Sequence, residues 1–154
     1  MLPRDEEIAK ILERKKKISM TSLKETPLIA PCGINCSICR AYLRERNPCP
    51  GCRGNNTVKP KTRVNCKIKT CTIFTDEEKT FCYQCKDFPC QILEKLDDRY
   101  RKRYHMSVLE NLEEIRDSGI EKFLENEKIR WTCTQCKGII CVHDGRCSQC
   151  GEPK

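Results

Sequence analysis

Residues 131–151 read WTCTQCKGIICVHDGRCSQCG. Two Cys-x-x-Cys pairs frame this stretch, and ten residues separate the two pairs. Four thiolates at such a spacing can reach the corners of a tetrahedron, which is the geometry that zinc takes with sulfur ligands. We therefore expect a zinc ribbon over residues 131–154, and its four structural ligands are Cys133, Cys136, Cys147 and Cys150.

The residues between the two pairs favour a hairpin. Residues 139–142 are typical of a strand, and the Asp-Gly pair that follows them favours a tight turn. Because side chains alternate along a strand, Cys141 and His143 would lie opposite Ile140 and Val142. We interpret these two as an uninvolved thiol and a surface imidazole, with a role as additional metal ligands as the alternative.

Ten more cysteines lie upstream, between residues 32 and 90. Eight would complete two further tetrahedral sites, so we expect about three zinc ions per chain. Short loops close at a lower entropic cost, which favours pairing neighbouring cysteines along the chain. The first of these sites would then use Cys49, Cys52, Cys66 and Cys71. The second would join Cys82 and Cys85 to two or more of Cys32, Cys36, Cys39 and Cys90.

Spacing leaves a crossed arrangement open. In it, Cys36 and Cys39 share one metal with Cys66 and Cys71. The second metal is shared by Cys49, Cys52, Cys82 and Cys85. Iron–sulfur clusters use the same thiolates, so an iron–sulfur cluster among residues 32–90 is the alternative to zinc.

Composition also indicates a metal-dependent fold. Hydrophobic residues make up 38% of the 154 residues, and that share includes all fifteen cysteines. Small domains with so little apolar material need disulfides or metals. An odd number of cysteines cannot pair completely, and no secretory signal follows Met1. We therefore expect reduced thiols in a cytoplasmic protein. We also expect no membrane span, because no apolar run reaches about eighteen residues.

The formal charge of +8 suggests a nucleic-acid partner only weakly. A zinc ion with four thiolates carries a charge of −2, so three such sites would lower the total to about +2. Nucleic-acid binding remains an alternative, and it would use the basic residues Arg40, Arg44, Arg46, Arg53, Lys59, Lys61 and Arg63.

Helical patterns lie on both sides of the cysteine-rich part. Residues 4–17 favour a helix within an N-terminal segment of residues 1–28, and residues 40–46 favour a short one. Further helices are expected after capping pairs or prolines. The capping pairs are Thr75 with Glu78, Ser107 with Glu110, and Ser118 with Glu121. Residues 90–104 should form a helix with Ile92, Leu93, Leu96 and Tyr100 inward and Arg99, Arg101, Lys102 and Arg103 outward.

These patterns predict a small, metal-stabilised α+β protein. Its cysteine-rich zinc-knuckle domain, with covering helices, would span residues 29–130, before the zinc ribbon of residues 131–154. The chain has two histidines, His105 and His143, in different modules, and no set of residues typical of catalysis. We therefore expect a binding protein rather than an enzyme, with Cys32 or Cys90 as the alternative nucleophile.

Three cysteine blocks resemble a known family. They are PCGINCSICRAY at residues 31–42, CPGCRG at residues 49–54 and CYQCKDFPC at residues 82–90. In this order they are similar to a cysteine-rich prokaryotic family known as domain of unknown function 3795. The resemblance extends over roughly residues 29–151, and members often end in a zinc ribbon. It implies metal binding and carries over no catalytic residue.

The leading functional hypothesis is a zinc-binding structural module that docks on a macromolecular partner, most simply another protein. An iron–sulfur redox or metal-transfer protein is the alternative from a different class.

Overall fold

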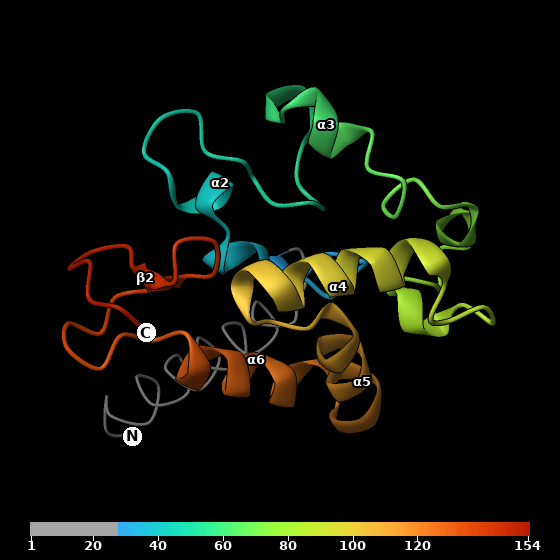
Figure 1. The fold of residues 1–154 in the computed structure, drawn as a ribbon. Coiled ribbons are helices and arrows are strands. Elements are labelled where there is room, and N and C mark those ends of the chain that lie inside the picture. Colours follow the sequence, from blue (N-terminus) through green and yellow to red (C-terminus); the bar gives the residue numbers. More distant parts are fainter. Residues whose placement is uncertain (1–27) are drawn as a thin grey trace, which may run out of the picture.

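The computed structural model describes residues 28–154, and the helix expected over residues 4–17 lies outside that part. An irregular cysteine-rich segment leads into three helices, and a short hairpin closes the chain (Figure 1). The helices are α4 (Gln91–Tyr104), α5 (Val108–Ser118) and α6 (Ile120–Arg130). None of the described helices has the length and apolar character that crossing a membrane requires.

The ends of these helices follow local chemistry, with one correction. Ser107 caps α5, because its hydroxyl accepts a hydrogen bond from the backbone N–H of Glu110 at 3.1 Å. The capping pair expected at Ser118 and Glu121 does not form. Ser118 is the last residue of α5, and Gly119, at φ +87°, separates α5 from α6. Only a glycine adopts that backbone conformation without strain, so it decides where the bend lies.

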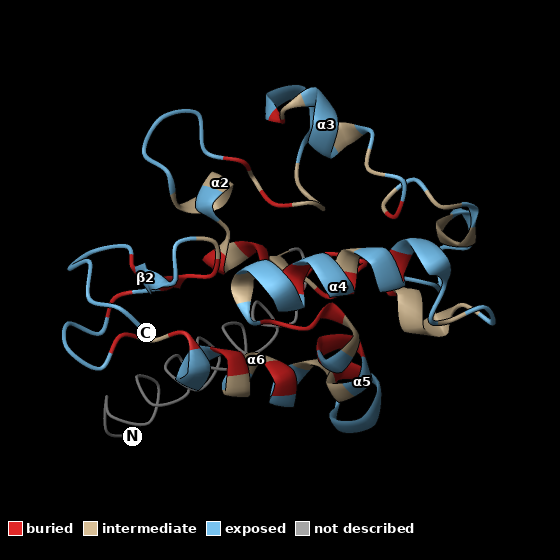
Figure 2. Ribbon diagram, in the orientation of Figure 1, coloured by how far each residue is buried: buried red, intermediate tan, exposed pale blue. Residues whose placement is uncertain are grey.

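An apolar core joins the three helices to the first described loop. Ile29, Leu93, Val108, Leu112 and Phe123 are each 0% exposed. Figure 2 shows the buried positions on the sides of α4, α5 and α6 that face one another. Fully burying one such side chain contributes about 1.5–3 kcal/mol. The helical half is therefore stabilised by hydrocarbon, contrary to the expectation of a core too small for the chain.

One inward assignment on α4 is wrong. Ile92 is 49% exposed, although Leu93 and Tyr100 are buried as expected. Leu93 and Tyr100 share a helical face because they are seven residues apart. Ile92 precedes Leu93 by one position, which turns its side chain away from that face.

The cysteine-rich segment, residues 32–90, contains only short elements. Between Cys39 and Cys90 the buried residues are Cys49, Gly51, Lys59, Ile68 and Phe81. Its elements are η2 (Cys36–Ile38), α2 (Arg40–Leu43), η3 (Asn56–Val58), α3 (Lys61–Val64), η4 (Thr72–Thr75) and η5 (Cys82–Gln84). Segment 39–90 therefore has little apolar core of its own, which fits the expectation of metal-dependent folding.

Two predicted helices in this segment are shorter or absent. The helix expected over residues 40–46 ends at Leu43, and Asn47 turns the chain at φ +47°. No helix begins at Thr75, which instead ends η4 and donates its hydroxyl proton to the carbonyl of Thr72 at 2.7 Å. The backbone N–H of Glu78, which a capping Thr75 would accept, donates instead to Oδ1 of Asp76 at 3.1 Å.

The C-terminal hairpin packs on the cysteine-rich segment. Strands β1 (Ile140–Cys141) and β2 (Arg146–Cys147) are antiparallel, with Ile140 opposite Cys147. The backbone N–H of Val142 donates to the carbonyl of Ile38 at 2.9 Å. Helices and a two-stranded sheet thus form a small, cysteine-rich α+β protein.

Candidate metal centre

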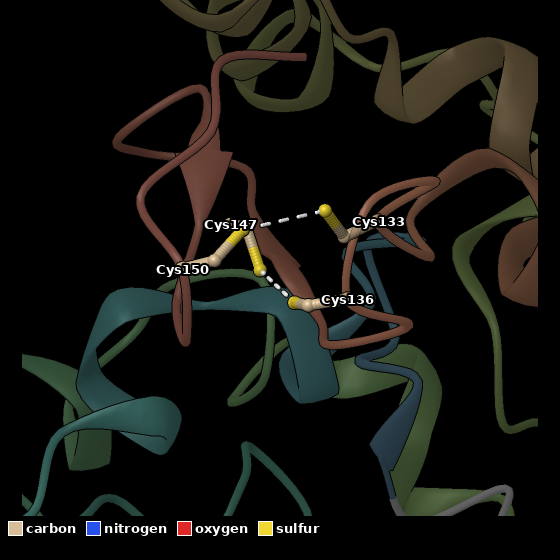
Figure 3. A group of neighbouring side chains, drawn as sticks. All are labelled: Cys133, Cys136, Cys147 and Cys150. Atoms are coloured by element: carbon tan, nitrogen blue, oxygen red, sulfur yellow. Dashed lines mark hydrogen bonds between the residues drawn. The ribbon is translucent and has the colours of Figure 1, made fainter.

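Four thiols meet at the hairpin. The sulfur atoms of Cys133, Cys136, Cys147 and Cys150 all lie within 4.8 Å of one another. Figure 3 shows the four side chains pointing toward one another from the two ends of the ribbon. The sulfur atoms of Cys133 and Cys150 are 3.6 Å apart, and those of Cys136 and Cys147 are 3.4 Å apart. A tetrahedron with zinc–sulfur bonds of about 2.3 Å has edges of about 3.8 Å, so a single ion fits.

Backbone turns hold these sulfur atoms in place. Lys137 and Gly151 follow the two Cys-x-x-Cys pairs and adopt φ values of +65° and +74°. The left-handed turn at Lys137 brings the backbone N–H of Gly138 to 3.4 Å from the sulfur of Cys136. Within the second pair, the backbone N–H of Gln149 lies 3.4 Å from the sulfur of Cys147. N–H groups aimed at sulfur favour the thiolate, which is the form that binds metal.

The thiols also influence one another. Backbone N–H groups of Cys150 and Gln149 favour the ionised form of Cys147 and lower its pKa to about 6. At Cys150 the backbone N–H of Glu152 acts in the same direction, but the neighbouring thiols outweigh it and raise the pKa to about 12. Four thiolates this close repel one another unless a cation lies among them. The group therefore suits a metal ion, and binding of one would release protons.

Cys141 is buried and His143 is half-buried, so His143 is not the surface imidazole that the sequence suggested. Ile140 and Val142 are buried too, and burial raises the pKa of the Cys141 thiol. Cys141 is outside the four-thiol group. His143 contacts Arg40 and Tyr100 instead of sulfur.

The upstream cysteines are more dispersed. Among residues 28–154, no further set of three or more metal-binding side chains converges as closely as the ribbon thiols. The nearest contact joins Cys36 and Cys52, where the backbone N–H of Cys52 donates to the sulfur of Cys36 at 3.4 Å. A hydrogen bond from the Cys36 thiol lowers the pKa of Cys52 to about 6, despite burial. Burial also raises the pKa of the Cys32 thiol, and the negative charges of Cys52 and Cys82 add to that effect.

A second sulfur group surrounds a small apolar cavity of about 30 Å³. Its sulfur-bearing walls are Cys71, Cys82, Cys85 and Cys90, and its apolar walls are Ile73, Phe74, Phe88 and Leu93. Cys71 belongs with these three in neither the sequential nor the crossed arrangement. The assignment of Cys32, Cys36, Cys39, Cys49, Cys52, Cys66 and these four to particular metals stays a prediction.

Two residues of the expected nucleic-acid surface are held inside the protein. Arg53 donates from Nε to the carbonyl of Ile29 at 2.8 Å, and its guanidinium lies 4.9 Å from the ring centre of Phe81. Lys59 is buried and donates from Nζ to the carbonyl of Cys52 at 2.6 Å. Both cations therefore fix loops of the cysteine-rich segment.

Comparison with known proteins identifies one part of the chain. Neither the curated proteins nor the solved structures contain a match to it. Residues 28–95 match a family described as "protein of unknown function (DUF3795)". The match includes the three cysteine blocks and ends within α4, short of the roughly 29–151 that the resemblance covered. The resemblance to the family of unknown function DUF3795 is therefore confirmed over residues 28–95.

Proposed function

We propose that this protein is a non-enzymatic binding module in which zinc ions hold a cysteine-rich chain in shape for docking on a macromolecular partner. The convergence of four thiols within 4.8 Å carries this proposal. When four protein sulfurs surround an ion, no position is open for water or substrate. Such a centre contributes to function by holding the surrounding backbone in place, and it does not catalyse a reaction.

The upstream cysteines are proposed to hold further zinc ions, about three per chain in total. The cavity lined by Cys71, Cys82, Cys85 and Cys90 supports one such site, because four thiols are the usual ligand set of a structural zinc ion. All fifteen cysteines are free thiols in the structure. Thiols in this number persist in a reducing compartment, which supports a cytoplasmic location.

Metal analysis of the full chain, purified without oxygen, tests the zinc proposal. We expect about three zinc ions per chain and a colourless protein. Fewer than two zinc ions would contradict the proposal. A brown protein that absorbs at about 400 nm would favour the alternative, an iron–sulfur redox or metal-transfer protein.

Docking on a protein partner requires its own test. Ile129 on α6 is 78% exposed, more than any other large apolar side chain in the described residues. A photo-crosslinking side chain at position 129 should capture one defined protein in cells. The same side chain at Arg116, exposed on α5, is the matched control. Equal capture from both positions, or none from position 129, would count against a partner on α6.

A further inference from the structure

A cavity of about 560 Å³ opens between α2, α3, α4 and the turn of the hairpin. We call it the arginine cavity, because its walls include Arg40, Arg44, Arg63, Arg99 and Arg103. These residues come from three separate helices or their ends. Sites for small ligands have volumes of about 300–1,000 Å³, so this cavity is large enough for one.

The positive charge of the arginine cavity is largely uncompensated. Arg40 forms an ion pair with Asp144, with the nitrogen and oxygen 2.5 Å apart. Within residues 28–154, no carboxylate lies within ion-pair distance of Arg63, Arg99 or Arg103. No acidic residue lines the cavity, and a single cysteine, Cys39, does. The arginines therefore do not merely offset a thiolate cluster.

The choice of cation narrows the class of ligand. The chain has seventeen lysines and thirteen arginines, yet every cation in the walls is an arginine. A guanidinium presents parallel N–H groups that match the oxygens of a phosphate, whereas an ammonium is a point charge. Arg99 and Arg103 are four residues apart on α4, so their side chains leave the helix on one face.

A hydroxyl adds a neutral donor to these charges. The backbone N–H of Arg40 donates to Nδ1 of His143 at 3.2 Å, which leaves the ring proton on Nε2. That Nε2–H lies 3.2 Å from the hydroxyl oxygen of Tyr100 and donates to it. The proton of the Tyr100 hydroxyl is then free to donate into the cavity. Tyr104 packs against His143, with ring centres 4.8 Å apart, and holds this pair in place.

From this geometry we propose that the arginine cavity binds a small phosphate-bearing ligand, such as pyrophosphate or a nucleoside polyphosphate. Nucleic acid is the less favoured source of phosphate, because a strand needs a continuous basic track. Arg53 and Lys59, which would extend such a track, are held internally.

Isothermal titration of the full-length, metal-loaded protein tests the proposal. The probes are inorganic phosphate, pyrophosphate, tripolyphosphate, ATP and single-stranded oligonucleotides of different lengths, all at one ionic strength. The variant R99Q/R103Q should bind pyrophosphate or ATP at least about tenfold more weakly than the wild type, since each charged hydrogen bond lost costs about that much. The control K95Q/K102Q removes the same charge from exposed positions of α4 outside the cavity and should bind within about twofold of the wild type.

The arms of the titration separate the sources of phosphate. Tighter binding of ATP than of tripolyphosphate, which has the same number of phosphates, assigns a nucleotide, and equal binding assigns the phosphates alone. Affinity that rises with oligonucleotide length overturns the proposal in favour of nucleic acid. The proposal is also overturned by equal losses in the two double variants, by no loss in R99Q/R103Q, or by no heat with any probe.

Discussion

His143 caps helix α2 from 103 residues away in the sequence, because its Nδ1 accepts a hydrogen bond from the backbone N–H of Arg40 at 3.2 Å. Arg40 is the first residue of α2, so its N–H has no acceptor within the helix. Burial lowers the pKa of His143, and the charges of Arg40 and Arg63 lower it further. The ring therefore stays neutral at physiological pH and keeps its acceptor.

Replacement of His143 by alanine should lower the free energy of unfolding by about 1 kcal/mol at pH 7.5, as for loss of a helix cap. The pKa of the folded state lies below the ordinary 6.5. Acid therefore protonates the unfolded chain first, and the advantage of the wild type shrinks as the pH falls below 6.5. Urea denaturation of both proteins at several pH values measures this difference. A difference independent of pH would show that the ring does not act as an acceptor.

Replacement of Cys136 by serine should remove one metal ion per chain. Cys136 is exposed, so the substitution leaves packing intact and removes one of four ligands. The matched control is Cys141→Ser, a buried thiol outside the group. It should lower stability and leave the metal content unchanged. Elemental analysis of both variants measures the number of metal ions per chain. A wild-type metal content in C136S would rule out a metal centre at these four thiols.

Two glycines with the same backbone conformation should respond differently to alanine. Gly33 has φ +89° and Gly119 has φ +87°, so the backbone strain is similar. A methyl group at Gly33 would lie 2.9 Å from Cγ of Leu112 and 2.9 Å from the carbonyl oxygen of Val108, whereas nothing lies within 4 Å at Gly119. We expect G119A to cost about 1 kcal/mol and G33A about 3 kcal/mol or more in thermal or urea unfolding. Equal costs would mean that the loop does not pack on α5.

Asp97 should stabilise the link between α4 and α5. Its carboxylate accepts hydrogen bonds from the hydroxyl of Ser107 at 2.7 Å and from Nε of Arg101 at 2.6 Å. Burial opposes ionisation, but these hydrogen bonds outweigh it and lower the pKa of Asp97. We expect Asp97→Asn to cost about 2 kcal/mol at neutral pH. Asp98→Asn, at an exposed neighbour that pairs only with Lys102, should cost less than about 0.5 kcal/mol.

The contribution of Asp97 has a defined pH dependence. Its pKa is lower in the folded protein than the ordinary 3.8. The stabilisation is therefore fully present above the unfolded value and is lost as the pH falls through the folded one. The difference between wild type and D97N should stay constant from about pH 8 to about pH 5 in urea denaturation. A difference that falls within this range would contradict the assigned cause.

Local patterns were sufficient to predict the four thiols of the hairpin and helix α4. The spacing of Cys133, Cys136, Cys147 and Cys150 predicted a group whose sulfur atoms all lie within 4.8 Å of one another. The expected helix over residues 90–104 corresponds to α4, and Ser107 caps α5 as predicted. These features depend on residues a few positions apart, and such short-range geometry is limited by backbone sterics and loop length.

Local patterns also misassigned several positions. Ser118 and Thr75 carry the capping signature, but each is used by the turn that precedes it. The capping signature was present each time, but the residue already belonged to the preceding turn or helix.

By itself, the sequence determined where sulfur ligands meet at the hairpin and where α4 and α5 begin, because those contacts join residues separated by short, geometrically limited loops. Only the tertiary structure set Gly33 against α5 and gathered the arginines of three helices around Tyr100 and His143. These contacts join residues that are far apart in the chain. Their partners are chosen by the burial of the shared apolar core, and no local spacing encodes that choice.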